Sequence, residues 1–233
     1  MKIAISYPPI ESGKGVPLLS QNRQFQWFNS PTYIYPMVPA YAATLLKNNG
    51  FNVVWDDAIA DGLTYSQWLE RIKKERPDVI AIETKTPVIK RHWEIIKDLK
   101  GLESGGWRLV TVLMGDHVTA MPEESMQESK VDFVLTGGDY DFLLLNLCNV
   151  IKDAPSLSPF ALRPSPNLEP GIWYRRNGQI KNTGQFQLNH NLDTLPFIDR
   201  DLTKWRLYSE KNGNYKRLPG TYTMVGRDCW YHK

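Results

Sequence analysis

The chain has 233 residues, enough for one α/β domain with an extension or for two small domains. It is 42% hydrophobic and 23% charged, with a formal net charge of only +3 and no block of Lys and Arg, which argues against nucleic acid as a partner. No run approaches the roughly 20 apolar residues of a membrane span, and the amino terminus lacks the features of a signal peptide, so we expect no membrane partner. With only two cysteines, Cys148 and Cys229, the chain is expected to be reduced and cytoplasmic.

Residues 1–153 alternate short apolar strands with amphipathic helices. The expected strands are residues 2–6, 52–55, 78–82, 108–114 and 132–136. The expected helices run from Tyr35-Pro36 to Gly50, from Thr64 to before Pro77, from Thr86-Pro87 to Leu99 and from Asp141 to Ile151. Thr64 and Gln67 form a capping box, and Pro87 suits the first position of a helix. This alternation predicts an α/β fold with a five-stranded parallel sheet of flavodoxin or Rossmann type and helices on both faces.

The pattern changes after residue 153. Residues 154–170 hold five prolines with serines among them, which indicates an irregular connection. Ile172–Tyr174 and Gln179–Lys181 flank Asn177-Gly178, so a β-hairpin is expected near residues 172–184. We therefore interpret residues 154–220 as a linker or extension that carries this hairpin.

In open parallel sheets, ligands bind beyond the carboxyl ends of the strands. The expected loops at those ends are rich in Gly, Pro and polar residues, and they are residues 7–10, 56–58, 83–86, 115–119 and 137–139. Gly115, Gly137 and Gly138 follow strands directly, where a missing Cβ lets a ligand approach the backbone; ordinary turn chemistry is the alternative. Asp139 leads into the last helix, whose free N–H groups favour a phosphate or a polar amide.

Three common kinds of site are disfavoured by what these loops lack. No GxGxxG or GxxxxGK[ST] motif follows a strand, which argues against dinucleotide-binding and P-loop proteins. A phosphorelay receiver needs an acidic pair after the first strand and an Asp after the third, and those places hold Tyr-Pro-Pro and Glu83. The histidines show no paired spacing with cysteines or acids that would indicate a zinc site.

Several segments that follow one another in the chain carry a family resemblance. Residues 114–124 (MGDHVTAMPEE) are similar to a Gly-Gly-x-His-x-Thr-x-x-Pro-Glu-Glu segment, and residues 132–139 (DFVLTGGD) to Asp-x-Val-x-x-Gly-Glu-Gly. Residues 195–202 (LPFIDRDL) resemble a Leu-Pro-x-Pro-Asp-Arg-Asp-Leu bridge, and residues 226–229 (GRDC) sit where a cluster-binding loop starts. Together with the opening strand and helix, these segments resemble cobalamin-dependent radical S-adenosylmethionine proteins over nearly the whole chain.

The resemblance implies that cobalamin is held at the carboxyl edge of the sheet, with its nucleotide tail among the loops after the fourth and fifth strands. The residues expected to contact cobalamin are Pro8, Pro9, Ile10, Glu83, Thr84, Lys85, Gly115, Asp116, His117, Thr119, Gly137, Gly138 and Asp139. The cobalt-ligating DxHxxG pattern is absent after the first strand, where the sequence reads Tyr-Pro-Pro-Ile-Glu-Ser-Gly. The expected role of His117 is therefore a hydrogen bond to the rim or tail of the cofactor.

For a full-length parent, the resemblance implies a carboxyl-terminal radical S-adenosylmethionine barrel that binds a [4Fe–4S] cluster and S-adenosylmethionine. Residues 221–233 would be the truncated start of this barrel, with a strand over Tyr222–Val225 and with Cys229 as a candidate cluster ligand. A CxxxCxxC loop would need a cysteine at position 233, where Lys233 stands. We expect the 233-residue chain alone to be catalytically inactive, with the substrate contacts coming largely from the barrel.

Two other functions stay open. One is a flavodoxin-like domain that binds a nucleotide or a nucleotide sugar, which the absence of a corrin absorbance spectrum would indicate. The other is a non-catalytic cobalamin carrier or sensor, which sequence beyond residue 233 would decide because a carrier needs no cysteine triad.

Overall fold

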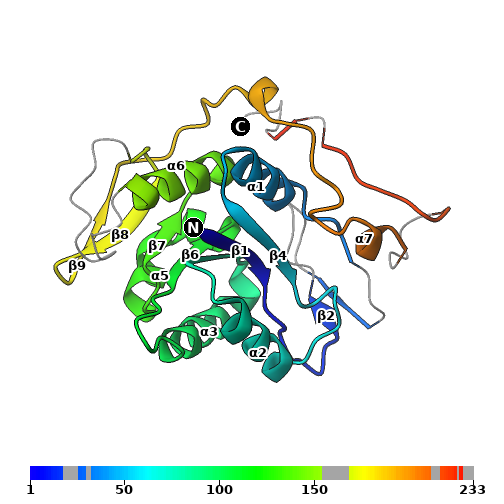
Figure 1. Ribbon diagram of the computed structural model, residues 1–233, viewed down its shortest axis with the longest axis horizontal. Coiled ribbons are helices and arrows are strands. Elements are labelled where there is room, and N and C mark those ends of the chain that lie inside the picture. Colours follow the sequence, from blue (N-terminus) through cyan, green and yellow to red (C-terminus); the bar gives the residue numbers. More distant parts are fainter. Residues whose placement is uncertain (18–25, 30–32, 154–167, 211–215, 225, 228–233) are drawn as a thin grey trace.

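The computed structural model describes residues 1–17, 26–29, 33–153, 168–210, 216–224 and 226–227. A central seven-stranded sheet organises these residues, with the strand order β4-β1-β5-β6-β7-β8-β9 (Figure 1). The strands, in chain order, are β1 Lys2–Tyr7, β4 Asn52–Asp57, β5 Val79–Glu83, β6 Val110–Met114, β7 Phe133–Leu135, β8 Ile172–Arg176 and β9 Gln179–Asn182. A separate two-stranded pair is formed by β2 Val16–Pro17 and β3 Trp27–Phe28, which the sequence did not predict.

Five of the strands form the expected parallel sheet. The pairs β4–β1, β1–β5, β5–β6 and β6–β7 are all parallel, which gives the flavodoxin-like order 2-1-3-4-5. Every residue of β5, β6 and β7 is buried, as expected for strands covered on both faces. The predicted fold class is confirmed.

Helices cover both faces of the sheet (Figure 1). All the helices of the described residues, in chain order, are α1 Met37–Asn48, α2 Tyr65–Glu75, η1 Thr86–Val88, α3 Ile89–Gly101, α4 Asp116–Ala120, α5 Pro122–Glu128, α6 Tyr140–Asp153, η3 Leu192–Thr194 and α7 Arg206–Glu210. Ile3 and Ile5 of β1 face a core that α1 and α6 complete, whereas Ala4 faces a second core with α2, α3 and α5. This division follows from the alternation of side chains along a strand.

Local signals set the helix ends largely as predicted. Thr64 and Gln67 form the capping box that opens α2. Gly50 follows α1 with a φ of +81°, which favours glycine. The segment from Thr86-Pro87 differs in detail, because it begins with the 3₁₀ turn η1 and becomes α-helical only at Ile89.

The predicted hairpin forms, and it enlarges the main sheet. β8 pairs with β7 in antiparallel fashion and with β9 across Asn177-Gly178, so the sheet has seven strands rather than five. Ile172 and Tyr174 are buried in the core under α1 and α6, while Trp173 packs against the opposite core. The hairpin residues are therefore part of both hydrophobic layers.

Two other expectations need correction. Residues 115–119 were expected as a loop, but Asp116–Ala120 form α4 and Pro122 then opens α5. Tyr222 to Met224 form no strand; Tyr222 and Met224 are partly buried against the core under α1 and α6. Val225, Cys229 and four of the five prolines in residues 154–170 lie outside the described residues.

The segment that carries α7 packs on the edge of the sheet at β4. The Tyr208 hydroxyl donates a 2.6 Å hydrogen bond to Oδ2 of Asp57, and Trp55 Nε1 donates to the Tyr208 hydroxyl at 3.0 Å. The Tyr35 ring meets Tyr208 edge to face at 5.2 Å, and its hydroxyl contacts Thr203. Within the described ranges, no helix is both long and apolar enough to span a membrane.

Candidate functional site

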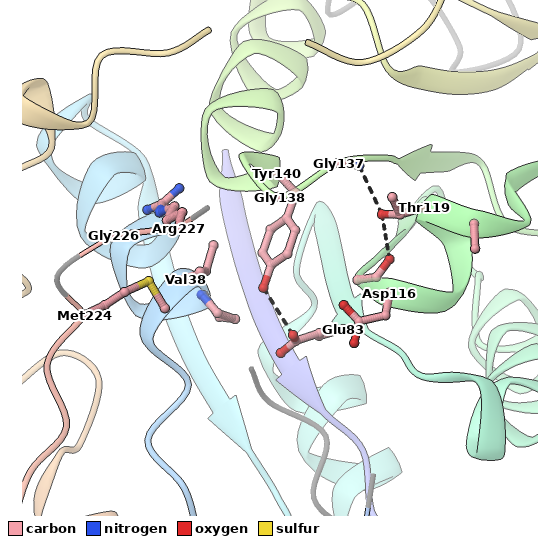
Figure 2. A pocket seen from close by; sticks show the side chains of 13 residues that line it. Val38, Glu83, Asp116, Thr119, Gly137, Gly138, Tyr140, Met224, Gly226 and Arg227 are labelled. Atoms are coloured by element: carbon pink, nitrogen blue, oxygen red, sulfur yellow. Dashed lines mark hydrogen bonds between the residues drawn. The ribbon is translucent and has the colours of Figure 1, made fainter. Parts of the chain in front are cut away.

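A cavity of about 400 Å³ lies beyond the carboxyl ends of β5, β6 and β7 (Figure 2). The start of α1 and residues from the end of the described chain complete its wall. The lining residues are Val38, Pro39, Glu83, Gly115, Asp116, Thr119, Ala120, Gly137, Gly138, Tyr140, Met224, Gly226 and Arg227. The sheet edge that the sequence singled out thus carries a partly open cavity of ligand size.

The backbone conformation and the close packing at Gly115 both require glycine. Its φ is +108°, and a Cβ there would lie 2.7 Å from the carbonyl oxygen of Thr84. Its own carbonyl accepts a 2.9 Å hydrogen bond from the hydroxyl of Thr119, which in turn accepts one from the backbone N–H of Gly137 at 3.0 Å (Figure 2). Thr119 therefore ties together the two strand ends that border the cavity.

A side chain would clash with its surroundings at Gly137 but not at Gly138. Gly137 has a φ of +90°, and a Cβ there would lie 2.7 Å from the ring of Phe186. At Gly138 a Cβ would meet only Leu188 Cδ2, at 3.7 Å, which is ordinary van der Waals contact. Turn chemistry and internal packing account for Gly115 and Gly137, whereas the fold tolerates a side chain at Gly138.

Glu83 forms a buried acidic part of the wall. The Tyr7 hydroxyl donates to Oε2 of Glu83. The Tyr140 hydroxyl donates to Oε1 at 3.2 Å, as Figure 2 shows. Burial raises the pKa of Glu83 to about 7, against the lowering effect of the two hydroxyls and of Lys85. Tyr7 and Glu83 end β1 and β5, the strands between which the order of the sheet reverses.

Six of the thirteen predicted residues line the cavity together, and the other seven are not part of its lining. Lining it are Glu83, Gly115, Asp116, Thr119, Gly137 and Gly138; outside the lining are Pro8, Pro9, Ile10, Thr84, Lys85, His117 and Asp139. Pro8 and Pro9 are buried and Ile10 is half-buried against the core. Cys229 lies outside the described residues.

Thr84 and Lys85 follow Glu83 in the chain but are not part of the cavity lining. The hydroxyl of Thr84 is 2.7 Å from Nδ1 of His92, a buried ring whose pKa burial lowers to about 3. The ammonium of Lys85 is 2.5 Å from Oδ2 of Asp116, and the Lys85 side chain is itself buried. The carboxylate that α4 presents at the cavity is therefore already paired with a lysine.

His117 faces away from the lining and into the helical layer. Nδ1 is 3.2 Å from the hydroxyl of Thr86, and Nε2 is 3.0 Å from a carboxylate oxygen of Glu124. The ring is buried and meets Trp93 edge to face at 6.3 Å. In α4, this geometry puts His117 on the side opposite Asp116 and Thr119.

Asp139 joins a polar cluster next to the cavity. Its Oδ2 is 3.2 Å from Nδ1 of His190, whose Nε2 is 2.8 Å from Glu169. The ring of His190 stacks on Phe142 at 4.3 Å. His190 thus links the segment after the hairpin to the start of α6.

Sequence reasoning missed the cavity residues contributed by distant parts of the chain, chiefly Tyr140, Met224 and Arg227. Tyr140 follows Gly137-Gly138-Asp139 directly, so its position in the chain could have identified it. Nothing local marks Arg227, because its role depends on a contact with Asp141. None of the described lining residues has an imidazole or a thiol, and no described group of three or more His, Cys, Asp and Glu residues could hold a metal ion.

Solved structures that share this fold include radical S-adenosylmethionine enzymes that use cobalamin. The cobalamin-dependent radical enzyme OxsB, with aqua-cobalamin and S-adenosylmethionine bound, superposes with a TM-score of 0.60 and 17% identity over 89% of this chain and 25% of OxsB. The methyltransferase TsrM of Kitasatospora setae, with cobalamin and a [4Fe–4S] cluster bound, superposes with a TM-score of 0.52 and 18% identity over 70% of this chain and 28% of TsrM. At the level of the fold, the resemblance expected from the sequence is confirmed.

Curated relatives match by sequence as well. The chain is 24% identical over 194 residues to an uncharacterized methyltransferase of Pyrococcus horikoshii, which covers 83% of this chain and 38% of the relative. It is 28% identical over 117 residues to the anaerobic magnesium-protoporphyrin IX monomethyl ester cyclase of Rubrivivax gelatinosus, which covers 50% of this chain and 20% of the cyclase. No protein-family profile matches the chain. The chain spans well under half the length of either relative.

Proposed function

We propose that this chain binds cobalamin at the carboxyl edge of its sheet, as the cobalamin domain of a radical S-adenosylmethionine enzyme. The observation that carries the proposal is the cavity beyond β5, β6 and β7, lined by three strand-end glycines. The shared fold with two cobalamin-bound enzymes supports it. In a complete enzyme, a [4Fe–4S] cluster and S-adenosylmethionine would be held by a radical S-adenosylmethionine barrel.

The residues present fit part of the cofactor. A volume of about 400 Å³ suits the nucleotide tail of cobalamin, while the corrin ring is too large for it and would need the open edge of the sheet. Gly138 is the clearest sign of fit, because the fold would accept a side chain there and glycine leaves the cavity wall open. Val38, Pro39 and Met224 would supply apolar contacts, and Thr119 would hold the wall in place.

When bound, cobalamin supplies a cobalt ion that carries a methyl group or an electron. The part of this chain is to bind and orient the cofactor. The described lining residues offer no imidazole, so we propose that the cobalt takes no histidine ligand from them. Methyl transfer or related radical chemistry would belong to the complete enzyme.

Reconstitution tests the proposal directly. The purified chain is incubated with cob(II)alamin, freed of excess by gel filtration, and examined for a corrin spectrum that co-elutes at about one equivalent. Gly138→Val should abolish co-elution without lowering the melting temperature by more than a few degrees. Gly101→Val is the matched control, because Gly101 ends α3 away from the cavity and a Cβ there meets nothing within 4 Å.

The alternative function is that the cavity binds a nucleotide in place of cobalamin. Co-elution of flavin mononucleotide or of a nucleotide sugar, with no uptake of cobalamin, would overturn the proposal. It would favour instead a flavodoxin-like nucleotide-binding domain.

A further inference from the structure

Glu83 is an acid in a place where the fold does not require a charge. Its side chain is buried at the end of β5, and no cationic group contacts its carboxyl oxygens among the described residues. Each oxygen instead accepts one tyrosine hydroxyl, Oε2 from Tyr7 and Oε1 from Tyr140. A buried carboxylate held only by neutral donors is costly unless something else compensates it.

The carboxyl group also has unused capacity to accept hydrogen bonds. A carboxylate offers about four lone-pair positions, and the two tyrosines occupy two of them. Glu83 lines the cavity, and so does Tyr140, whereas Tyr7 is buried behind them. The remaining acceptor positions are therefore available to a molecule in the cavity.

The charged groups around Glu83 come from several elements. Lys85, two positions further along the chain, lowers the pKa of Glu83, whereas Asp116 of α4 raises it. Asp57 of β4 raises the pKa of Tyr7. Asp141 raises the pKa of Tyr140, and Arg227 lowers it. Lys85 is itself paired with Asp116, and its lowering effect on the pKa of Glu83 is larger than the raising effect of Asp116.

We propose that Glu83 accepts hydrogen bonds from amide N–H groups of the bound cofactor and releases a proton when the cofactor binds. This inference rests on the proposed function. Cobalamin carries several primary amides around its corrin ring and one amide in the link to its tail. An ionised carboxylate accepts hydrogen bonds from such donors more strongly than a protonated carboxyl does.

The pKa of Glu83 sets the direction in which cofactor affinity should change with pH. Before binding, burial holds the pKa of Glu83 at about 7, so the free chain carries a proton there for part of the time at neutral pH. Hydrogen bonds from the cofactor favour the charged form and lower this pKa. Affinity should therefore rise with pH through the region around 7 and level off above it.

The test is a binding titration with methylcobalamin, which has no axial water to titrate in this range, between about pH 5.5 and 8.5. Affinity should increase up to about tenfold from pH 6 to pH 8, for one proton released. Calorimetry in two buffers with different ionisation enthalpies should show that proton directly. An infrared difference spectrum should lose the band of a protonated carboxyl group on binding.

Three variants separate Glu83 from other groups. Glu83→Gln should bind with an affinity that does not depend on pH and should release no proton. Tyr7→Phe removes a donor that lowers the pKa of Glu83 and lies outside the cavity lining, so the pH profile should move upward. Asp98→Asn, whose carboxylate accepts from Tyr65 on the exposed surface of α3, should behave as wild type.

The outcomes distinguish the two proposals. Tight binding that is independent of pH, with no proton released, overturns the role of Glu83 and leaves cobalamin binding intact. The same pH profile in wild type and Glu83→Gln also overturns it. Failure of wild type to bind at any pH overturns the proposed function, and the inference falls with it.

Discussion

Arg227 forms a bidentate ion pair with Asp141 across 86 positions of the chain. Nη1 donates to Oδ1 at 2.7 Å and Nη2 donates to Oδ2 at 2.6 Å. Asp141 is completely buried in the first turn of α6, and the guanidinium lies 5.3 Å from the ring centre of Tyr41. The pair holds Arg227 in the wall of the cavity, so the end of the described chain is part of the candidate site.

Breaking this pair should destabilise the protein. Arg227→Ala leaves the Asp141 carboxylate buried without a charged partner, which should cost about 3 kcal/mol in the free energy of unfolding, measured with urea. Arg227→Met combined with Asp141→Leu should recover most of the loss, because it removes both charges. Lys73→Ala breaks the exposed pair with Glu70 and should change stability by less than about 1 kcal/mol. Equal effects of the two single variants would contradict the assignment.

Gly115 and Gly138 should separate folding from binding. Gly115→Ala places a Cβ at positive φ and 2.7 Å from the carbonyl oxygen of Thr84, so it should lose about 2 kcal/mol or more of stability. Gly138→Ala meets no close atom and should change stability by less than about 0.5 kcal/mol. Thermal and urea unfolding of both variants check this. A comparable loss at Gly138 would mean that this glycine also serves the fold.

Asp57 should make stability depend on pH. Burial raises its pKa from 3.8 to about 6 in the folded chain. A raised pKa stabilises the fold below the unfolded value, and that contribution is lost as pH rises through the folded value. Relative to Asp57→Asn, wild type should therefore lose about 2–3 kcal/mol between about pH 4 and 6 and little more above about pH 7.

Urea unfolding at several pH values measures that difference. Asp98→Asn is a useful control, since Asp98 is an acid on the exposed surface whose carboxylate accepts a hydrogen bond from Tyr65 and does not contribute to the shift at Asp57. A difference between wild type and Asp57→Asn that grew more favourable to wild type as pH rose would have the wrong sign and would refute the burial argument.

The cobalt should lack a histidine from this chain. His117 faces Thr86 and Glu124, and the described lining residues include no histidine. Electron paramagnetic resonance of the chain loaded with cob(II)alamin should show no nitrogen coupling from a protein imidazole. His117→Ala should leave the spectrum unchanged while lowering stability, because it empties a buried position beside Trp93. Coupling that disappears in His117→Ala would reverse this assignment.

The parallel sheet could be predicted because its evidence is local. β5 and β6 are apolar runs buried on both faces, and the capping box of Thr64 and Gln67 fixes the start of α2. The hairpin was predicted from Asn177-Gly178, but its pairing with β7 was not, since no local pattern specifies a strand partner. The polar segment Asp116–Ala120 lacks helical periodicity and was expected to be a loop.

The candidate site was predicted only in part, for a related reason. Glycines after strands mark the edge of a parallel sheet, so Gly115, Gly137 and Gly138 could be found. Which way a side chain points from that edge depends on packing: His117 turns toward Trp93 while Thr119 turns toward Gly137. The contributions of Arg227 and Met224 depend on tertiary contacts that residues near them in the sequence do not encode.

The antiparallel pairing of β7 with β8 has a consequence for how the chain is made. β7 is only three residues long, and until β8 is synthesised its outer backbone groups have no partner from β8. An unpaired strand edge is a template for pairing with another molecule. A nascent chain that pauses between residues 153 and 172 would therefore leave this edge open to pairing, although only over the short length of β7. Once the hairpin docks, the sheet ends instead at β9, whose Gln179, Lys181 and Asn182 are exposed and polar, a composition that discourages association between molecules.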